Sequence, residues 1–219
     1  MTNKVVESTD NLITELIQNA VNVAVIPSKV AGADAFTAGI GLYYSLKLNG
    51  KKVSFVYPGK IPEGFENLID VEEVMSDIKR RSLIVSIDYS NIPATKVHYT
   101  TKDDVLKLVL SPVSKDFDLG RISTELKGFD FDLIFTVGAQ DLNDFGQTYR
   151  ELQREFGAAK IVNLDNHNIN QRFGTVDIVD TSEQGLCLLV LNKLARWGLK
   201  VDYVSAEALL RGISSTKLK

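Results

Sequence analysis

The sequence has few of the residues on which several classes of protein depend. Cys187 is the single cysteine among 219 residues, so the chain cannot form an internal disulfide. It lies in the apolar run LCLLVLNKL, which predicts a small core residue and a reducing compartment. No apolar stretch approaches the roughly 20 residues of a membrane helix, and the amino terminus lacks a signal-peptide core. We therefore expect a cytoplasmic protein without membrane contact.

An excess of one charge is also missing. The 25 Lys and Arg residues against 28 Asp and Glu residues give a net charge of -3. This balance argues against a protein that coats nucleic acid through bulk charge, and leaves a local basic groove open. The glycine-rich stretch AGADAFTAGIG contains neither the G-x-G-x-x-G pattern nor a Walker lysine. We therefore interpret Gly39 and Gly41 as positions where a helix packs against a sheet.

Short β-branched runs alternate along the chain with segments of helical period, which is typical of βαβ units around a parallel sheet. The pattern predicts an α/β protein, a Rossmann-like three-layer domain with a mainly parallel five-stranded sheet. The third strand has a continuous apolar core, Leu83 to Val85 and Ile87, which suggests burial on both faces. Strands are predicted at 21–28, 51–58, 81–90, 129–142 and 160–167, and helices at 11–19, 31–50, 71–80, 144–157, 182–198 and 204–213.

One segment has a different period. VHYTTKDDVLKLVLSP has two alternating runs around the polar turn TTKDD, which predicts a β-hairpin at about 96–113, inserted between the third and fourth parallel strands. No internal repeat, low-complexity tract or linker separates the remaining elements. We therefore expect a single domain over 1–219.

The most informative stretch is KIVNLDNHNI, residues 160–169. Its apolar run ends abruptly in Asp165, Asn166 and His167, so a buried strand delivers polar side chains to a sheet edge. Open α/β sheets place their chemistry at this edge. Together with the following NQRFGTVDIVDTSEQG and an apolar helix, the segment resembles the signature region of the DHH phosphoesterase superfamily. The name-giving Asp-His-His of that family closes a two-metal hydrolytic site.

The resemblance covers nearly the full chain and is closest to the bacterial oligoribonuclease and phosphoadenosine-phosphate phosphatase-like branch. It implies the DHH domain fold and a phosphate ester substrate, in a short oligonucleotide or a small nucleotide. Members usually carry a second, substrate-gripping domain after this point. That C-terminal substrate-binding domain is expected to be absent here, since the sequence stops at Lys219.

Most metal-ligand positions of the family are substituted. Aligning the first loop on SKVAGADAFTAG leaves Ser28 at the family's histidine and Gly32 at its first aspartate, and keeps Asp34 at its second. The strand that should end in an aspartate, LIFTVGAQDL, has Gly138 there, and Asp141 matches a polar position beyond the ligand.

The two remaining motifs are altered in the same way. In the signature, Asn166 replaces the first histidine, a metal ligand, while His167 matches the second, which faces the phosphate. The closing GISSTKL places Thr216 at the last aspartate. Because Mn and Mg prefer carboxylate, imidazole and other oxygen donors, Ser, Gly and Thr supply weak donors or none. The resemblance therefore implies a degenerate site.

The surviving candidates are Asp34 and Asp165 as metal ligands, these two with His167 as catalytic remnants, and Asn166, His167 and Arg172 as phosphate contacts. Each also has a structural interpretation. Asp34 can cap a helix, Asp165 and His167 can bond each other, and Arg172 can be a solvated surface residue. We expect a phosphoesterase-like protein kept as a nucleotide- or phosphate-binding or interaction module. No cofactor is expected, or Mn or Mg if the protein is active.

Two further hypotheses stay open. The first is an active metal-dependent phosphoesterase that uses relocated ligands from the set Asp34, Asp88, Asp141, Asp165, His167 and Asp180. The second is a structural subunit that binds a protein partner or forms a homodimer through the apolar helix face with Leu186, Leu189 and Val190.

Overall fold

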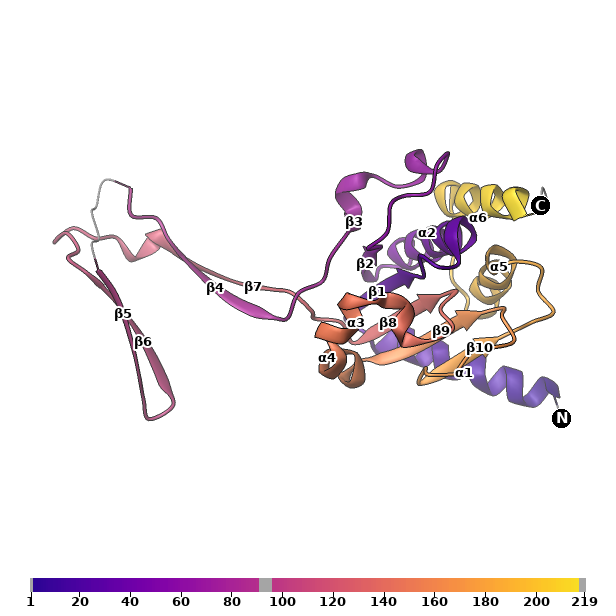
Figure 1. Ribbon diagram of the computed structural model, residues 1–219, viewed down its shortest axis with the longest axis horizontal. Coiled ribbons are helices and arrows are strands. Elements are labelled where there is room, and N and C mark those ends of the chain that lie inside the picture. Colours follow the sequence, from indigo (N-terminus) through magenta and orange to yellow (C-terminus); the bar gives the residue numbers. More distant parts are fainter. Residues whose placement is uncertain (1, 91–95, 217–219) are drawn as a thin grey trace. The chain divides into compact units, whose positions relative to one another are not determined.

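The computed structural model describes residues 2–90 and 96–216, with side chains from residue 7, and the chain divides into two compact units (Figure 1). The first unit combines Met1–Arg80 with Gly128–Lys219, and the second is Arg81–Lys127. No helix in the described part of the chain is both long and apolar enough to cross a membrane.

The first unit is built on a six-stranded sheet in the order β10-β9-β8-β1-β2-β3, and all neighbouring strands are parallel. The α/β fold class is thereby confirmed, but the sheet has six strands rather than the expected five. The strands are β1 (Asn22–Pro27), β2 (Lys52–Val56), β3 (Val74–Met75), β8 (Leu133–Val137), β9 (Lys160–Asp165) and β10 (Val176–Val179).

Apolar side chains cover both faces of this sheet, which gives three layers. Along β1, Val23 and Val25 join one hydrophobic cluster, whereas Ala24 and Ile26 join another. The first cluster includes side chains of α1 (Thr2–Asn19), α2 (Gly32–Leu48), α5 (Leu186–Arg196) and α6 (Tyr203–Thr216). The second includes side chains of η4 (Leu142–Phe145) and α4 (Gln153–Ala158), and the short α3 (Gln147–Glu151) lies between them in the chain.

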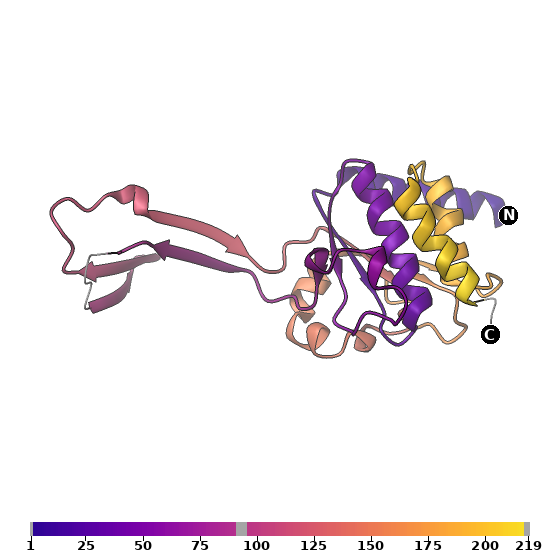
Figure 2. The ribbon, with the colours of Figure 1, turned by 90° about the horizontal axis from the view of Figure 1, so that it is seen from above.

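Glycines set the close approach of α2 to its neighbours. A Cβ at Gly39 would meet the side chains of Pro27 and Phe55, which confirms tight packing of the helix on the sheet. Gly41 instead faces Leu209 of α6, so it serves helix–helix packing, and α2 and α6 lie side by side (Figure 2).

The second unit consists of two antiparallel ribbons. One pairs β4 (Ser82–Ile87) with β7 (Ile122–Lys127), and the other pairs β5 (Lys96–Lys102) with β6 (Val105–Ser111). A short 3-10 turn, η3 (Leu119–Arg121), precedes β7. The β5–β6 ribbon confirms the hairpin expected at about 96–113.

The prediction of a buried parallel strand at 81–90 is wrong. β4 pairs with β7 and not with the central sheet, and Leu83 is 65% exposed. An apolar run of this length indicates a strand but cannot specify its partner, because the same residues suit a buried strand or one apolar face of a ribbon.

Several other elements differ from the prediction. The helix expected at 71–80 is a 3-10 turn, η2 (Val71–Glu73), followed by β3, while a further turn, η1 (Glu66–Leu68), lies before it. The helix expected at 144–157 is broken into η4, α3 and α4, with Gly146 in a left-handed conformation at φ 58° between the first two. The first helix begins at Thr2 instead of residue 11, and neither β7 nor β10 was predicted.

We expect Gly212→Ala to destabilise the protein by about 1–3 kcal/mol, because a Cβ in α6 would collide with Cys187 of α5 and Thr37 of α2. Chemical denaturation measures this loss. The matched control is Gly157→Ala in α4, where a Cβ meets nothing within 4 Å, and stability should stay the same or rise by about 0.5–1 kcal/mol. Equal effects of the two substitutions would contradict the packing argument.

Candidate functional site

The substituted motif positions lie at one edge of the sheet. Ser28 follows β1, Gly138 follows β8 and Asn166 follows β9, and these three strands are parallel neighbours. The backbone N–H of Ser28 donates to Val137 O at 2.8 Å, and that of Gly138 donates to Leu164 O at 2.8 Å. The fold therefore gathers these positions at the carboxyl ends of the strands, as the sequence predicts, although the ligand side chains have changed.

At Gly138 there is no room for a side chain. A Cβ there would lie 2.7 Å from Leu186 Cδ1, 2.8 Å from Ala31 Cβ and 3.0 Å from Ala35 Cβ, and the backbone has φ 72°. An aspartate at this position would be strained at this φ and would require Leu186, Ala31 and Ala35 to shift. The space that a ligand would occupy is filled by apolar side chains.

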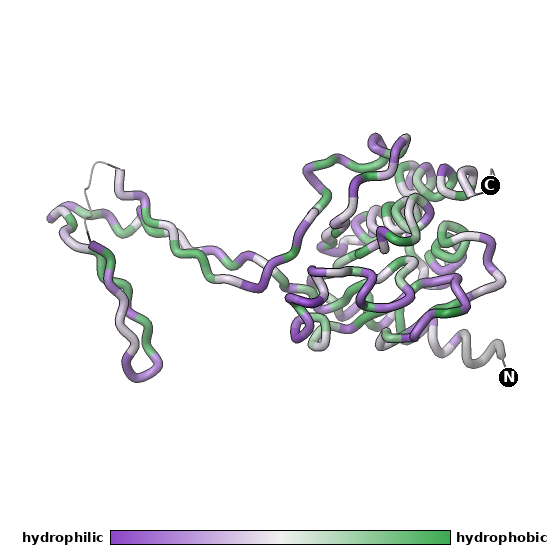
Figure 3. Tube along the Cα trace, viewed as in Figure 1, coloured by the Kyte–Doolittle hydropathy of each residue, from purple (hydrophilic) through white to green (hydrophobic). Residues whose placement is uncertain are grey.

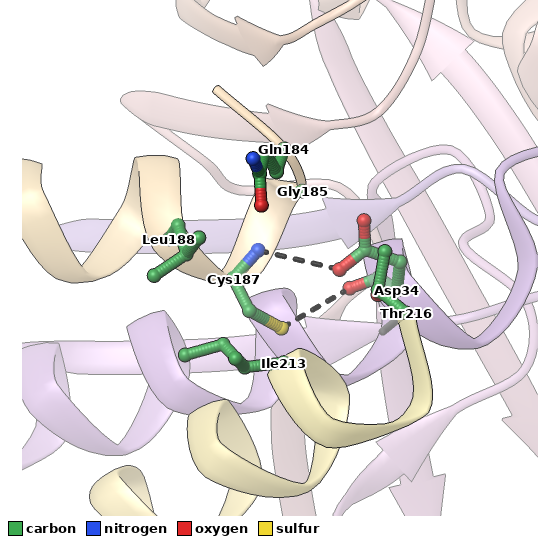
Figure 4. Close-up of a pocket in the computed structure, with 7 residues that line it drawn as sticks. All are labelled: Asp34, Gln184, Gly185, Cys187, Leu188, Ile213 and Thr216. Atoms are coloured by element: carbon green, nitrogen blue, oxygen red, sulfur yellow. Dashed lines mark hydrogen bonds between the residues drawn. The ribbon is translucent and has the colours of Figure 1, made fainter. Parts of the chain in front are cut away.

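Asp34 lies in the first turn of α2 and caps a different helix. Its Oδ2 accepts the N–H of Leu186 at 2.8 Å. Its Oδ1 accepts the N–H of Cys187 at 3.3 Å (Figure 4). These are first-turn N–H groups of α5, whose N-cap residue, Gly185, has no side chain to bond them. The carboxylate charge also complements the positive end of the α5 dipole. Asp34 thus holds α2 and α5 together.

A small cavity of about 100 Å³ lies beside Asp34. Thr216, at the family's last aspartate position, lines it, but its Oγ1 donates to Gly212 O at 3.0 Å within α6. The full lining is Asp34, Gln184, Gly185, Cys187, Leu188, Ile213 and Thr216 (Figure 4). The structure therefore brings Asp34 and Thr216 to the same cavity, with the threonine hydroxyl bonded to its own helix.

Cys187 is fully buried, which confirms that it is a core residue. Its Sγ lies 3.2 Å from Thr37 Oγ1. Burial, together with the nearby Asp34 carboxylate, raises the pKa of the thiol, so the reactive thiolate is disfavoured.

Asp165 is fully buried at the end of β9. Its Oδ1 bonds His167 Nδ1 at 2.7 Å, and its Oδ2 accepts a hydrogen bond from Asn170 Nδ2 at 2.7 Å. The same Asn170 amide group donates to Ala139 O at 2.8 Å. Both carboxylate oxygens are therefore bonded to the protein.

Further hydrogen bonds connect Asn170 to the interior of the sheet. Asn170 Oδ1 accepts the backbone N–H of Arg172 at 2.8 Å and a hydrogen bond from Asn163 Nδ2 at 3.1 Å. Asn163 is fully buried, and its Oδ1 accepts from Thr136 Oγ1 of β8 at 2.9 Å. From the sequence, Asn163 and Asn170 belong to a cluster of asparagines that could contact a base or a phosphate, or could be ordinary loop residues. In the structure both amides bond within the protein, and the spacing of Asn163 and Asp165 puts these two side chains on one face of β9.

The candidate phosphate contacts are more accessible. The His167 side chain is 41% exposed, and Asn166 Nδ2 donates to Glu183 O at 3.3 Å. Arg172 is exposed and has a left-handed backbone conformation at φ 53°. It lines a second cavity, of about 320 Å³, together with Lys193 and Arg196 of α5. Asp177, Asp180 and Glu183 also line this cavity, so its charge is mixed.

The relocated donors each have local partners. Asp88 belongs to the second unit, and hydrogen bonds from the Ser90 hydroxyl and backbone lower the pKa of its carboxyl. Asp141 caps η4. The Ser182 hydroxyl and N–H lower the pKa of Asp180 in the same way. Within residues 2–90 and 96–216, no group of at least three His, Cys, Asp or Glu residues could hold a metal ion.

The donor set does not fit the two-metal centre that the DHH resemblance implies. Such a centre holds two divalent cations roughly 3.5–4 Å apart and needs several carboxylates and imidazoles to offset their charge. Here Gly138 is enclosed by apolar groups, and Asp34 and Asp165 bond protein groups with both oxygens.

The interpretation of Leu186, Leu189 and Val190 as an exposed dimer face is wrong. These side chains are at most 1% exposed and belong to the hydrophobic cluster between the sheet and its helices. The apolar stripe of α5 faces the core of its own unit.

No family model matches the sequence, and no curated protein matches it. Among solved structures, the fold is similar to that of an exopolyphosphatase-related protein from Bacteroides fragilis, with a TM-score of 0.65 and 14% sequence identity. The match covers 96% of this chain and 50% of that one, so the chain spans about half the length of this neighbour. At this identity the likeness concerns the fold alone.

We expect Asp34→Ala to destabilise the metal-free protein by about 0.5–2 kcal/mol, because the first-turn N–H groups of α5 lose their acceptor. Thermal and chemical denaturation measure the change. Asp34→Asn, which keeps one side-chain oxygen as an acceptor, should retain part of the stability. If Asp34 served only a cation, its removal would leave the metal-free protein equally stable or more stable.

Proposed function

We propose that this protein is a catalytically degenerate, phosphoesterase-like member of the DHH lineage, which retains the fold as a nucleotide- or phosphate-binding or interaction module. The observation that carries the proposal is the bonding of its remaining acids. Asp34 caps α5, and the buried Asp165 accepts from His167 and Asn170. Both acids therefore act within the protein's own hydrogen-bond network.

Metal binding would break hydrogen bonds that the two acids make to the protein. If Asp34 turned to a cation, the N–H groups of Leu186 and Cys187 would lose their acceptor at a helix start. If Asp165 did so, the Asn170 amide would lose a partner in a buried network. An unsatisfied buried polar group costs about 1–3 kcal/mol. Gly138 supplies no compensating ligand.

Phosphate recognition does not require a metal. The bond from His167 Nδ1 to Asp165 orients the imidazole and leaves Nε2 available on a side chain that is 41% exposed. The Arg172 guanidinium can bind a phosphate in bidentate fashion, and the Asn166 amide can add a neutral donor. The ligand class consistent with these groups is a phosphate monoester or diester, as in a small nucleotide or a short oligonucleotide.

The proposal is tested by isothermal titration calorimetry, in which adenosine monophosphate or a short oligoribonucleotide is titrated into the wild-type protein. We expect binding without turnover, weakened roughly tenfold by His167→Ala and by Arg172→Ala, which corresponds to about 1.4 kcal/mol each. The matched control is His98→Ala, which removes the other histidine, an exposed residue of the second unit.

A hydrolysis assay with the same two substrates and added Mn separates the proposal from its alternative. Release of phosphate or nucleotide that is lost in Asp34→Ala would establish an active phosphoesterase and contradict the degenerate site. Equal affinity of the wild type and both site variants would remove His167 and Arg172 as phosphate contacts.

A further inference from the structure

Exposed apolar side chains are concentrated in the second unit. Of the 24 large hydrophobic residues that are exposed among the described residues, 13 lie within residues 81–127. The other 11 are scattered over the larger first unit. Figure 3 shows apolar and polar residues alternating along the strands of this segment. Such a concentration in a small unit marks an interaction surface.

The register of the β5–β6 ribbon separates its two faces. Directly paired residues lie on the same side, so Tyr99 with Leu108 and Val97 with Leu110 share one face. Thr101 and Leu106 complete it, and no residue of this face is charged. We call these six residues the apolar face of the β5–β6 ribbon. Tyr99 is 73% exposed and Val97 is 67% exposed.

The opposite face is polar and basic. It carries the pairs Lys96 with Ser111, His98 with Val109, Thr100 with Lys107, and Lys102 with Val105. The hairpin is therefore amphipathic, with one face suited to water and the other to a hydrophobic partner.

The β4–β7 ribbon is built in the same way. Its register places Leu83 with Leu126, Val85 with Thr124, and Ile87 with Ile122 on one face. Leu83 and Leu126 are 65% and 60% exposed. Two successive ribbons thus each have one uncharged, largely apolar face.

An uncovered ribbon of this kind is physically unfavourable. An isolated two-stranded hairpin is marginally stable at best in water, and its free edges and apolar side chains favour association. Burying a Leu or Val side chain contributes about 1.5–3 kcal/mol relative to leaving it in solvent. A partner that covers the face would therefore stabilise the ribbon itself.

We propose that the apolar face of the β5–β6 ribbon docks on the same face of a second copy of this chain, forming a homodimer. Face-to-face packing of two ribbons would make a small sandwich, with sheets about 10 Å apart and a two-fold axis between them. The ribbon has seven paired positions and is about 24 Å long at about 3.4 Å per residue, and three of the seven pairs form the apolar face.

Charge favours a second copy over nucleic acid. Residues 81–127 contain seven Lys and Arg against six Asp and Glu, so two copies of the unit repel each other little. The face itself brings no charge into the interface, which avoids the cost of burying one. An uncharged apolar face of the same length is available on an identical ribbon. The near-neutral balance does not favour nucleic acid, which would need a marked basic excess.

The decisive comparison uses two adjacent residues of β6. Leu108 is 48% exposed on the apolar face, and Val109 is 47% exposed on the polar face. Both are aliphatic and lie on the same strand, so substitution by lysine perturbs the ribbon similarly in the monomer. Only an interface on the apolar face distinguishes them.

Sedimentation velocity of the full chain over roughly a hundredfold range of concentration gives the oligomeric state. We expect the wild type and Val109→Lys to dimerise with similar affinity, and Leu108→Lys to dimerise at least tenfold more weakly. Circular dichroism confirms that both variants keep the wild-type strand content. Tyr99→Lys, opposite Leu108 in the register, should reproduce the loss.

Three results would overturn the proposal. They are a wild type that stays monomeric throughout, a dimer that Leu108→Lys leaves intact, and equal weakening by the two β6 variants. A monomer that binds RNA or DNA through the lysines of the polar face would likewise replace the dimer with a nucleic-acid arm. Because the readout is oligomeric state, failure here leaves the proposed phosphate binding untouched.

Discussion

The bond between the Asp34 carboxylate and the first turn of α5 is the constraint on which the sheet edge depends. Gly185 cannot cap the helix that it precedes, so the acid of α2 supplies the acceptors. This bond fixes where α5 begins, and with it the position of Leu186 against Gly138. The residue that would ligate a cation in a metal site thereby positions the helix that fills the site.

Asp165, at the end of β9, is likewise bonded to the protein through both oxygens. Its two oxygens bond His167 and Asn170, and Asn170 connects to Asn163 inside the sheet. A buried charge is tolerated when hydrogen bonds satisfy it, and here the partners are side chains of the same loop. The outcome is an ordered edge with an accessible imidazole.

The sequence predicted the elements that have a clear period and a buried face. The strands at β1, β2, β8 and β9 and the helices α2, α5 and α6 follow from apolar periodicity, because burial selects it. The relation of Gly138 to Leu186 could not be predicted, since it depends on a contact between residues far apart in the chain. The capping of α5 by Asp34 could not be predicted either, because the sequence suggests that a first-turn acid caps its own helix.

The predictions that were wrong concern which element packs against an apolar strand or helix face. The run from Leu83 to Ile87 has the composition of a buried strand, but its register with β7 makes it one side of an exposed ribbon. Likewise, the apolar stripe of α5 suggested a dimer face and is instead core. Period identifies an element and its apolar face, whereas tertiary structure decides what covers that face.

The central claim, that the surviving acids serve the fold rather than a cation, is tested most directly by calorimetric titration of Mn into the metal-stripped protein, with Asp34→Ala alongside. The account predicts no saturable binding that depends on Asp34. Stoichiometric binding in the wild type that disappears in Asp34→Ala would contradict it, because Asp34 would then leave the first turn of α5 to ligate the metal.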